Sequence, residues 1–492
     1  MKQNKFKIYT LGCKVNQYDS ADLNRKMIAA GFTWVEKGAD IVIVNTCCVT
    51  KTAISKCKRM INKARAENPK AKVIVMGCWP KAYKSEVKKL GVDPAPGHLS
   101  GASLIWGVGE LDKLVKGIKI LCDNCRIATF DLEARNRFLA SKSRIVMTDG
   151  ARYFIKIQDG CEQFCSYCII PYTRGKLKSR PMQEVIDEVR QAVKAGYREV
   201  VLCGIHLGLY AREGLRESRR QRRGSAFASP PAGRAGATAD KEGHLVDLLK
   251  ELIKIKDLGR IRLSSIEVTE VSNELINLIF KSKKICKHLH IPLQSGSDKI
   301  LQLMNRPYNV KYFRNKIKQI RKLVPPASPL TSQGGDIAIT TDVIIGFPGE
   351  TKKDFQETCD FIKEMQFSRL HVFPFSAHEK TAAAKMGNKV EKEEIAKRAK
   401  KLRQLGKKLE SDFRKKFVGQ ELAVVVEGKI KDTRCPTCAS PMASARQVGH
   451  RVFTYKGKTE YYFDIEFKRS QIISKQNMAN INEIVTIRFD KI

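Results

Sequence analysis

Short apolar strands alternate with helical stretches through most of this sequence, and this alternation limits the folds that the chain can adopt. In residues 1–140 the pattern predicts parallel strands, because each strand is followed by a helix that can cross back over a sheet. A doubly wound α/β domain is therefore expected, with its ligands at the carboxyl ends of the strands. The strands are expected at Phe6–Leu11, Ile41–Val44 and Val73–Met76, and the helices at Ser20–Ala30 and Thr50–Ala66.

A second α/β unit is predicted over residues 147–386. Most neighbouring strands there enclose a helical pattern, such as Glu184–Ala195 or Leu245–Lys254. Repeated units of this kind favour a partial (β/α)6 barrel with its active site at the C-terminal mouth, although periodicity alone equally allows an open α/β sheet. The strands are expected at Phe154–Gln158, Val200–Leu202, Arg260–Leu263, His288–Ile291, Ala338–Ile345 and Leu370–Phe373.

The last part of the chain changes pattern. Residues 387–416 form a link that contains a charged amphipathic helix, and residues 417–492 predict a small β-barrel, a class that includes RNA-binding barrels. Its strands are expected at Glu421–Val426, Arg451–Tyr455, Glu460–Phe467 and Glu483–Phe489. Segments rich in Ala, Ser, Pro, Gly and Arg are interpreted as surface insertions near residues 212–240, 325–335 and 432–447.

The charge balance points to a polyanionic partner. Lys and Arg number 91 against 51 Asp and Glu, a formal charge of +40, which is typical of nucleic-acid binding, although a generally basic proteome is the alternative. The N-terminus has no continuous apolar segment, and no stretch approaches the ~20 apolar residues of a membrane span. We expect a cytoplasmic protein, in which 15 cysteines favour metal ligation over disulfides.

The strongest local motif is a C-x3-C-x2-C spacing directly after the first barrel strand, formed by Cys161, Cys165 and Cys168. Three thiolates on a tight loop can hold three irons of a [4Fe–4S] cluster and leave the fourth iron for a substrate or cofactor. Zinc is the alternative, but it normally takes four protein ligands, or three with histidine. No histidine is expected near this loop, so the cluster is favoured.

A second set of cysteines is dispersed along the N-terminal domain. Cys13, Cys47 and Cys78 each follow one of its predicted strands, and residues just past parallel strands converge at one edge of the sheet. Together they predict a second cluster. Cys48 is an alternative to its neighbour Cys47 as the middle ligand, although Cys47 is nearer to the strand and is preferred. Cys57 lies on the following helix and is expected to pack in the interior. Two further C-x2-C pairs, each half a zinc site, are interpreted as free surface thiols: Cys122/Cys125 and Cys435/Cys438.

Longer motifs resemble one enzyme family. The cysteine loop resembles the radical S-adenosylmethionine (SAM) superfamily, and TLGCKVNQYDS, VNTC, KIQDGCEQFCSYCIIPYTRG, HLHIPLQSGSDKILQLMNRPY and TTDVIIGFPGET together resemble its methylthiotransferases. The resemblance covers nearly the whole chain and implies a cluster domain, a radical SAM barrel and a TRAM-type β-barrel. LGCKVNQ is most similar to enzymes that act on N6-threonylcarbamoyladenosine in tRNA.

The resemblance also implies the chemistry. An open iron would chelate SAM, a 5′-deoxyadenosyl radical would abstract hydrogen, and the second cluster would carry the sulfur, with two SAM per turnover. The expected partners are a tRNA anticodon stem-loop and an electron donor such as flavodoxin or ferredoxin, and the enzyme is expected to be a monomer. Isopentenyladenosine in tRNA and an aspartate of a ribosomal protein are alternative substrates. A non-enzymatic RNA-binding protein is disfavoured, because structural metal sites are usually closed by protein ligands.

Further site residues are predicted from their positions. Polar or glycine residues near strand ends tend to be functional in barrels, with turn chemistry as the alternative. The SAM-binding candidates are Tyr167, Gly204, Glu267, Gln294, Ser295, Asp342 and Gly346. Basic and aromatic residues of the tail can contact phosphates and bases, with barrel packing as the alternative. These candidates are Lys456, Lys458, Tyr461, Lys468 and Arg469.

Overall fold

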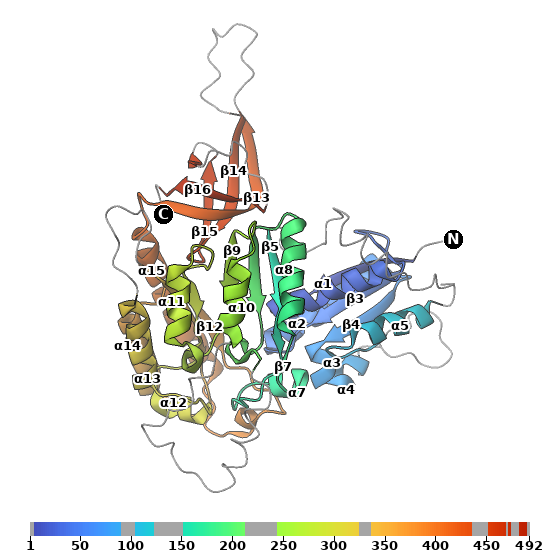
Figure 1. The fold of residues 1–492 in the computed structure, drawn as a ribbon. Helices are drawn as coiled ribbons and strands as arrows, with labels where there is room; N and C mark the ends of the chain where they lie inside the picture. Colours follow the sequence, from blue (N-terminus) through green and yellow to red (C-terminus); the bar gives the residue numbers. More distant parts are fainter. Residues whose placement is uncertain are drawn as a thin grey trace, which may run out of the picture.

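The computed structural model describes residues 4–89, 104–122, 151–211, 244–323, 336–434, 451–468, 471–473 and 482–489. Figure 1 shows an N-terminal α/β part beside a central set of strands and helices, with a C-terminal sheet at one end of that central body. In the part of the chain that is described, no helix combines the length and apolar character needed to cross a bilayer.

The N-terminal part is the predicted parallel sheet, with strand order β2-β1-β3-β4. Its strands are β1 (Lys5–Thr10), β2 (Thr33–Trp34), β3 (Ile41–Thr46) and β4 (Lys72–Gly77). All six residues of β3 are buried, as expected for a central strand covered on both faces. Its helices are α1 (Lys14–Ala29), α2 (Lys51–Glu67), α3 (Cys78–Ala82), α4 (Lys84–Val87) and α5 (Leu111–Leu121).

Apolar side chains explain why helices cover both faces of this sheet. On one face, Ile61 of α2 packs with Val42 and Val44 of β3. On the other face, Leu23 of α1 and Leu114 of α5 join a second buried cluster. The doubly wound arrangement is therefore confirmed, and β2 and α5 are additions that the sequence pattern did not predict.

The central body contains six parallel strands in chain order. Pairing joins β5 to β8 to β9 and β10 to β11 to β12, and bridges such as Ser265–His290 connect the two sets. The strands are β5 (Arg152–Lys156), β8 (Glu199–Cys203), β9 (Arg260–Leu263), β10 (His288–His290), β11 (Ala338–Ile345) and β12 (Arg369–Pro374). Within the described ranges no pairing closes β12 onto β5, which agrees with the predicted partial barrel.

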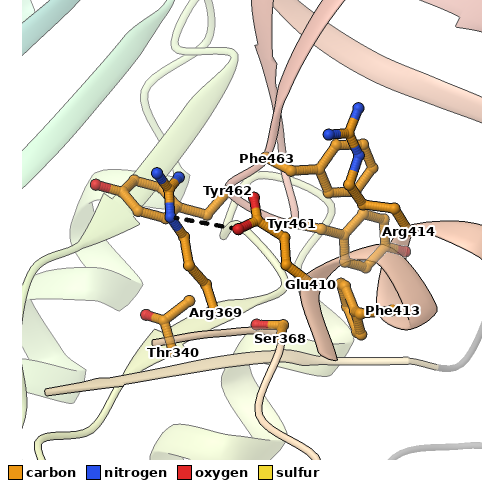
Figure 2. A pocket seen from close by; sticks show the side chains of 9 residues that line it. All are labelled: Thr340, Ser368, Arg369, Glu410, Phe413, Arg414, Tyr461, Tyr462 and Phe463. Carbon is orange, nitrogen blue, oxygen red and sulfur yellow. Dashed lines mark ion pairs between the residues drawn. The ribbon is translucent and has the colours of Figure 1, made fainter. Parts of the chain in front are cut away.

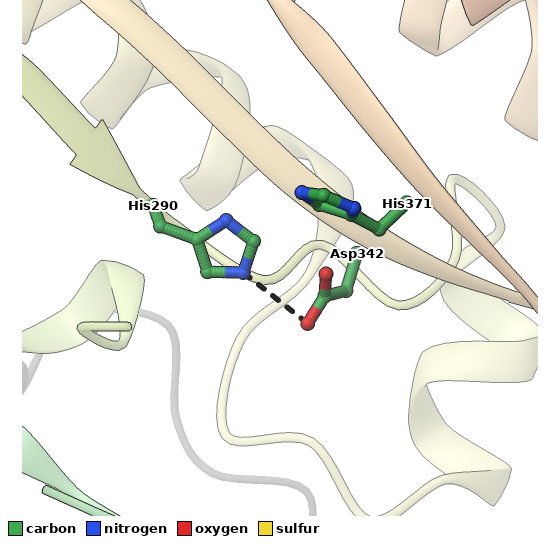
Figure 3. Close-up of side chains that lie close together, drawn as sticks. All are labelled: His290, Asp342 and His371. Atoms are coloured by element: carbon green, nitrogen blue, oxygen red, sulfur yellow. Dashed lines mark ion pairs between the residues drawn. The ribbon is translucent and has the colours of Figure 1, made fainter. Parts of the chain in front are cut away.

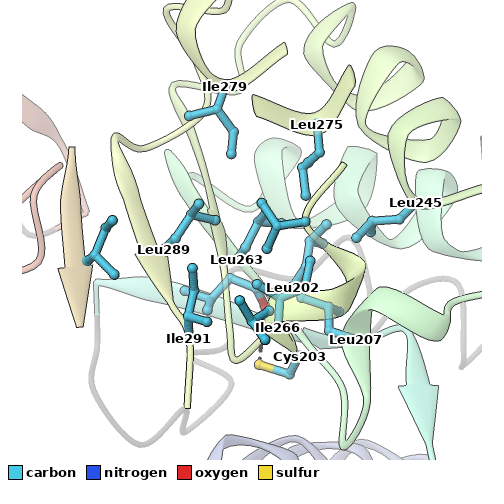
Figure 4. Packing of buried hydrophobic residues seen from close by; sticks show 14 of the residues in the cluster. Leu202, Cys203, Leu207, Leu245, Leu263, Ile266, Leu275, Ile279, Leu289 and Ile291 are labelled. Atoms are coloured by element: carbon cyan, nitrogen blue, oxygen red, sulfur yellow. Dashed lines mark hydrogen bonds between the residues drawn. The ribbon is translucent and has the colours of Figure 1, made fainter. Parts of the chain in front are cut away.

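Helices cover the outside of these strands. Figure 4 shows Leu202 and Leu263 from the strands packed with Leu275 and Ile279 of a helix. The principal helices are α8 (Met182–Lys194), α10 (His244–Ile253), α11 (Asn273–Lys281), α12 (Asp298–Leu303), α13 (Val310–Lys322) and α14 (Lys352–Met365). Because side chains alternate along a strand, the other face of each strand points into the barrel.

The C-terminal part is an antiparallel sheet with strand order β15-β14-β13-β16. It follows α15 (Lys392–Lys415) and consists of β13 (Glu421–Arg434), β14 (Arg451–Thr459), β15 (Asp464–Lys468) and β16 (Ile484–Arg488). Register pairing of β13 with β14 extends to Arg434 opposite Arg451, so the paired strands include the first residues of the insertion predicted near 432–447. The insertions near 212–240 and 325–335, and the residues Cys125, Cys435, Cys438 and Arg469, lie outside the described residues.

A buried ionic network attaches this sheet to the barrel. Arg260 and Arg262 each donate through Nε to the fully buried carboxylate of Glu199 at 2.8 Å. Their outer nitrogens donate to backbone carbonyls of the C-terminal part at 2.8–2.9 Å: those of Ala423, Lys458 and Thr459. One carboxylate thus holds two guanidinium groups in position to bind another domain.

A pocket lies along the same junction (Figure 2). Arg369 of β12 faces Glu410 of α15 across it at 3.9 Å, and Tyr461 and Tyr462 of the C-terminal part contribute to its wall. None of its lining residues is a cysteine. We therefore assign this pocket to the interdomain junction and separate it from the thiol sites described next.

Candidate active site

The structure brings together the dispersed N-terminal cysteines. Cys13 caps α1 directly after β1, Cys47 follows β3, and Cys78 begins α3 directly after β4. Burial raises the pKa of Cys78 to about 12, and nearby Cys13 and Cys47 add to that rise. Burial likewise raises the pKa of Cys47 to about 11, and Cys13 contributes again. All three thiols therefore lie within electrostatic reach of one another.

Asn16 lies between these strand ends. Its amide nitrogen donates to the carbonyls of Leu11 at 2.9 Å and Thr46 at 3.0 Å, which joins the ends of two neighbouring strands. Its Oδ1 lies 3.8 Å from Cys13 Sγ and 3.9 Å from Cys78 Sγ. Asn16 is thus a positioning residue for two of the three thiols.

Glycine permits this close approach. Gly77, with φ of +105°, precedes Cys78, and a Cβ there would lie 2.5 Å from both Asn45 Oδ1 and the carbonyl of Thr46. Gly12, with φ of +113°, precedes Cys13, and a Cβ there would lie 2.9 Å from that of Cys47. Any side chain at these two positions would push the strand ends apart.

The neighbouring cysteines have packing roles. Cys48 is fully buried in the apolar cluster beneath α2, and burial raises its pKa. Cys57 exchanges 3.4 Å hydrogen bonds with the backbone of Cys47. Cys122 is also buried, so it is not the surface thiol that the sequence suggested.

The second thiol set lies on a loop between β6 (Gln158–Asp159) and α7 (Ile170–Arg174). The strand β6 pairs with β7 (Lys178–Ser179), and the amide of Cys161 donates to the carbonyl of Gly175 at 3.0 Å. Gly160 has φ of +74°, and a Cβ there would lie 1.9 Å from the carbonyl oxygen of Lys176. The glycine before the motif therefore allows the loop to fold back tightly.

Polar groups from other strands contact these thiols. Arg306 Nη1 donates to Cys165 Sγ at 3.2 Å, and His206 Nδ1 lies 3.5 Å from Cys161 Sγ. Burial disfavours the charged form of His206, but Glu270, at 2.5 Å, and Cys161 together raise its pKa to about 10. The sequence argument that no histidine lies near the loop was wrong, because His206 comes from the turn after β8. Donors of this kind stabilise negative charge on sulfur.

Among the described residues, the thiols of neither set are gathered as closely as three ligands of one ion. Across the described residues, three ligand atoms within 4.8 Å of one another occur only at His290, Asp342 and His371. Neither thiol set is therefore gathered around one ion, as zinc with its ~2.3 Å bonds to sulfur would require. A cluster binds each thiolate through a different iron, so its ligands stand further apart. The donor set of three thiols at each site is compatible with a [4Fe–4S] cluster.

Arg174 connects the two thiol sites, and the sequence analysis missed it. From α7 its Nη1 donates to Asp159 at 2.9 Å, just before the cysteine loop. Its Nη2 donates to Asn16 Oδ1 at 2.7 Å and to Asp19 at 3.1 Å, both in the N-terminal domain. Arg174 also lowers the pKa of Cys78. The available signal was an arginine in PYTRG, directly after the cysteine motif.

Among the predicted SAM-binding residues, two lie beside the cysteine loop. Glu267 forms an ion pair with Arg306, which itself contacts Cys165. Tyr167 lies within the loop and packs against a small apolar cluster that includes Met304. Both residues therefore lie where a ligand bound next to Cys161, Cys165 and Cys168 could contact them.

The other predicted SAM-binding residues, except Asp342, make contacts within the barrel that shape or pack its loops. Gly204 forms a tight turn, in which a Cβ would lie 3.0 Å from Gln158 Oε1. Gln294 has φ of +67°, and its amide donates to the carbonyl of Asp342 at 2.8 Å. The predictions for Ser295 and Gly346 do not fit. Ser295 is buried 3.4 Å from Thr358 of α14, and a Cβ on Gly346 would lie 2.3 Å from Ile395 of α15, so both are packing positions.

Asp342 lies within β11 rather than at its end. Its Oδ2 is 3.2 Å from His290 Nε2, and His371 on β12 faces both groups (Figure 3). Two imidazoles and a carboxylate can bind a divalent metal. Burial lowers the pKa of His371 to about 4; Asp342 opposes this shift, and His290, Arg369 and Lys14 add to it. We assign no metal here.

The tail candidates divide into exposed and buried residues. Lys456 and Lys468 are exposed on the C-terminal sheet. Lys458 is instead buried in an ion pair with Asp464, and Tyr461 packs 4.3 Å from Phe417 in the core. Both side chains are buried in contacts within the C-terminal part, and this placement does not fit the prediction that Lys458 and Tyr461 contact RNA.

Comparisons with known proteins agree with this geometry. The description "Radical SAM superfamily" matches residues 155–362, and "Uncharacterized protein family UPF0004" matches residues 5–94. The chain is 33% identical over 435 residues to the threonylcarbamoyladenosine tRNA methylthiotransferase MtaB of Bacillus subtilis (strain 168), covering 86% of this chain and 85% of the relative. It is 30% identical over 436 residues to tRNA-2-methylthio-N(6)-dimethylallyladenosine synthase of Carboxydothermus hydrogenoformans, covering 88% and 90%.

Among solved structures, the radical SAM methyltransferase TsrM of Kitasatospora setae aligns with a TM-score of 0.49 at 13% identity, over 78% of this chain and 77% of that one. The matched barrel and the cysteine loop after its first strand define a radical SAM enzyme. This class uses SAM and an iron–sulfur cluster. More narrowly, the chain belongs to the methylthiotransferase family of radical SAM enzymes.

Proposed function

We propose that this enzyme methylthiolates carbon 2 of N6-threonylcarbamoyladenosine beside the anticodon of tRNA, giving the 2-methylthio derivative. The observation that carries the proposal is the arrangement of two three-thiol sites at the junction of two domains, which Arg174 links. Carbon 2 of adenine has no acidic proton, so general acid–base catalysis has little to act on. When bound, SAM and the clusters supply a carbon radical, the methyl group and the sulfur.

The residues of this chain hold and orient those groups. Cys161, Cys165 and Cys168 would hold the cluster that binds SAM, with Tyr167, Gly204, Glu267 and Gln294 nearby on strand-end segments. His206 and Arg306 donate toward the thiols and stabilise their negative charge. Cys13, Cys47 and Cys78 would hold the second cluster, and the placement of Cys48 in the apolar core favours Cys47 as the middle ligand.

The C-terminal sheet is proposed to be a TRAM-like RNA-binding domain. Its exposed Lys456 and Lys468 are suited to phosphate contacts with the anticodon stem-loop. The formal charge of +40 supports a polyanionic partner and argues against a basic ribosomal protein as substrate. We place the enzyme in the cytoplasm as a monomer that receives electrons from a flavodoxin or ferredoxin.

A second candidate substrate is dimethylallyladenosine in tRNA, because a relative named for it matches nearly as well as the one named for threonylcarbamoyladenosine. Mass spectrometry of tRNA nucleosides from a deletion strain distinguishes the two. We expect loss of the 2-methylthio form of threonylcarbamoyladenosine and an unchanged dimethylallyl form. An unchanged threonylcarbamoyl product, in a strain without a redundant enzyme, would refute the assignment.

The cluster assignment has its own test. Iron and sulfide are counted per chain in the wild type and in the Cys13→Ala and Cys161→Ala variants after anaerobic reconstitution. Each substitution is expected to remove about half of the iron, since each site would hold about four irons. Cys48→Ala is the matched control and should retain the wild-type content. Full iron retention in Cys13→Ala would contradict the second cluster.

A further inference from the structure

A cation beside the N-terminal thiol set lies close to residues of the barrel strands and of the C-terminal sheet. Lys14 directly follows Cys13 and begins α1, and its side chain is half-buried. Its ammonium lies 5.5 Å from the centre of the Tyr462 ring, which comes from the C-terminal part and stacks on His288 at 4.4 Å. Within the described ranges Lys14 makes neither an ion pair nor a hydrogen bond through its ammonium group.

The other cations around Tyr462 each have a carboxylate partner, which Arg262 shares with Arg260. Arg152 is paired with Glu427 at 2.9 Å, Arg262 with Glu199 at 2.8 Å, and Lys458 with Asp464. Lys14 therefore leaves a net positive charge in a partly desolvated region. Burying an unpaired charge is unfavourable, so such a group is expected to meet an anion in the working complex.

The pKa values of two side chains, Tyr462 and His371, reflect the positive charge of Lys14. Burial alone would raise the pKa of Tyr462, yet that pKa is lowered, and Lys14 is the largest contributor to the lowering. Burial also lowers the pKa of His371 in the barrel to about 4; Asp342 opposes this shift, whereas His290, Arg369 and Lys14 add to it. The charge of Lys14 therefore acts on one side chain of the C-terminal sheet and on one of the barrel.

The substrate assigned under Proposed function supplies a suitable anion. Threonine joined to the carbamoyl group through its amino nitrogen keeps its α-carboxylate, which is ionised at neutral pH. The dimethylallyl group of the alternative substrate is an uncharged hydrocarbon. The charge of Lys14 and the thiol of Cys13 both act on the buried thiol of Cys203, so the ammonium lies on the side of the barrel where sulfur transfer is proposed.

We propose that Lys14 binds the carboxylate of the threonylcarbamoyl group and so selects this nucleoside over adenosines with neutral N6 substituents. The inference rests on the proposed function and adds the residue that determines specificity. A hydrogen bond between charged partners is worth about 1.5–3 kcal/mol, which corresponds to roughly a 10- to 150-fold change in affinity.

Equilibrium binding by the reconstituted holoenzyme tests this, at one fixed salt concentration because phosphate contacts depend on salt. The ligands are anticodon stem-loops that carry threonylcarbamoyladenosine, its neutral carboxamide analogue, or unmodified adenosine. The proteins are the wild type, Lys14→Gln, Lys14→Arg and the control Lys37→Gln, which changes an exposed lysine. Iron content shows whether the substitution beside Cys13 has damaged the cluster site.

We expect the wild type to bind the carboxylate form at least about tenfold more tightly than the carboxamide form. Lys14→Gln should lose this preference, whereas Lys14→Arg and Lys37→Gln should keep it. Equal weakening of all three RNAs, or an unchanged preference in Lys14→Gln, would overturn the inference. The carboxamide comparison in the wild type needs no substitution and decides whether the carboxylate is recognised at all, so equal affinity for the two forms would overturn the inference even when a variant loses iron. A Lys14-dependent preference without any methylthiolated product would instead refute the reaction and leave the recognition standing.

Discussion

Replacing Glu199 by glutamine should loosen the C-terminal sheet from the barrel. Glu199 is fully buried, and its carboxylate holds Arg260 and Arg262, whose other nitrogens bind carbonyls of the sheet. Glutamine keeps the size of the side chain but removes the charge that both guanidinium groups require. Two buried cations would then face a neutral amide, which is strongly destabilising.

The magnitude follows from the titration of Glu199. Burial opposes its ionisation, but Arg260 and Arg262 outweigh burial and lower its pKa from 4.5 to about 2. A shift of roughly 2.5 units at 1.36 kcal/mol per unit corresponds to about 3 kcal/mol. Since the folded-state pKa is lowered, this stabilisation is present above about pH 4.5 and is lost as the pH falls toward 2. The difference between wild type and Glu199→Gln should therefore shrink over that range.

Limited proteolysis measures the opening of this junction. Trypsin cleavage after Lys458, next to the fully buried Thr459, requires the sheet to separate from the barrel. When opening is fast relative to cleavage, the rate follows the open population, so about 3 kcal/mol predicts roughly hundredfold faster cleavage at pH 7.

The control is Glu251→Gln, which removes an exposed ion pair with Lys254. Surface pairs contribute about 0–1 kcal/mol, so this variant should change the rate less than about fivefold. A Glu199→Gln rate within fivefold of wild type would show that the buried network does not hold the domains together.

Three further outcomes are expected. Arg174→Met should reduce iron retention at the N-terminal thiols while circular dichroism stays unchanged; unaltered iron content would show that the link is dispensable. Gly77→Ala should lower the thermal unfolding temperature, because its φ of +105° and a 2.5 Å contact add strain of about 1–3 kcal/mol, whereas Gly387→Ala, with no atom within 4 Å, should not; equal shifts would contradict the packing argument. Replacing Lys456 and Lys468 together by glutamine should reduce the salt dependence of tRNA binding by about two counterions, and an unchanged slope would exclude them as phosphate contacts.

Local patterns in the sequence predicted the elements and the thiol sets well. The apolar run Ile41–Val44 in β3 is uninterrupted because helices cover both faces of this strand, so it is visible in any short window of the sequence. The convergence of Cys13, Cys47 and Cys78 followed from topology, since each residue comes directly after a parallel strand.

Local sequence patterns could not predict contacts between segments that are far apart in the chain. His206 approaches Cys161 from another strand, and Arg174 meets Asn16 over a separation of 158 positions. Lys458 and Tyr461 showed the reverse problem, because a basic or aromatic residue on a short strand has the same pattern whether it faces RNA or the core.

By itself, the sequence determined the order of strands and helices, the spacing of cysteines on the 161–168 loop and the excess of positive charge, because these are properties of neighbouring residues and of composition. Only the tertiary structure decided which charges are neutralised. Arg152, Arg262 and Lys458 have carboxylate partners from other elements, whereas Lys14 has none among the residues that the structure describes. Pairing of buried charges depends on distances of a few ångströms between segments far apart in the chain, and those distances exist only once the domains have packed together.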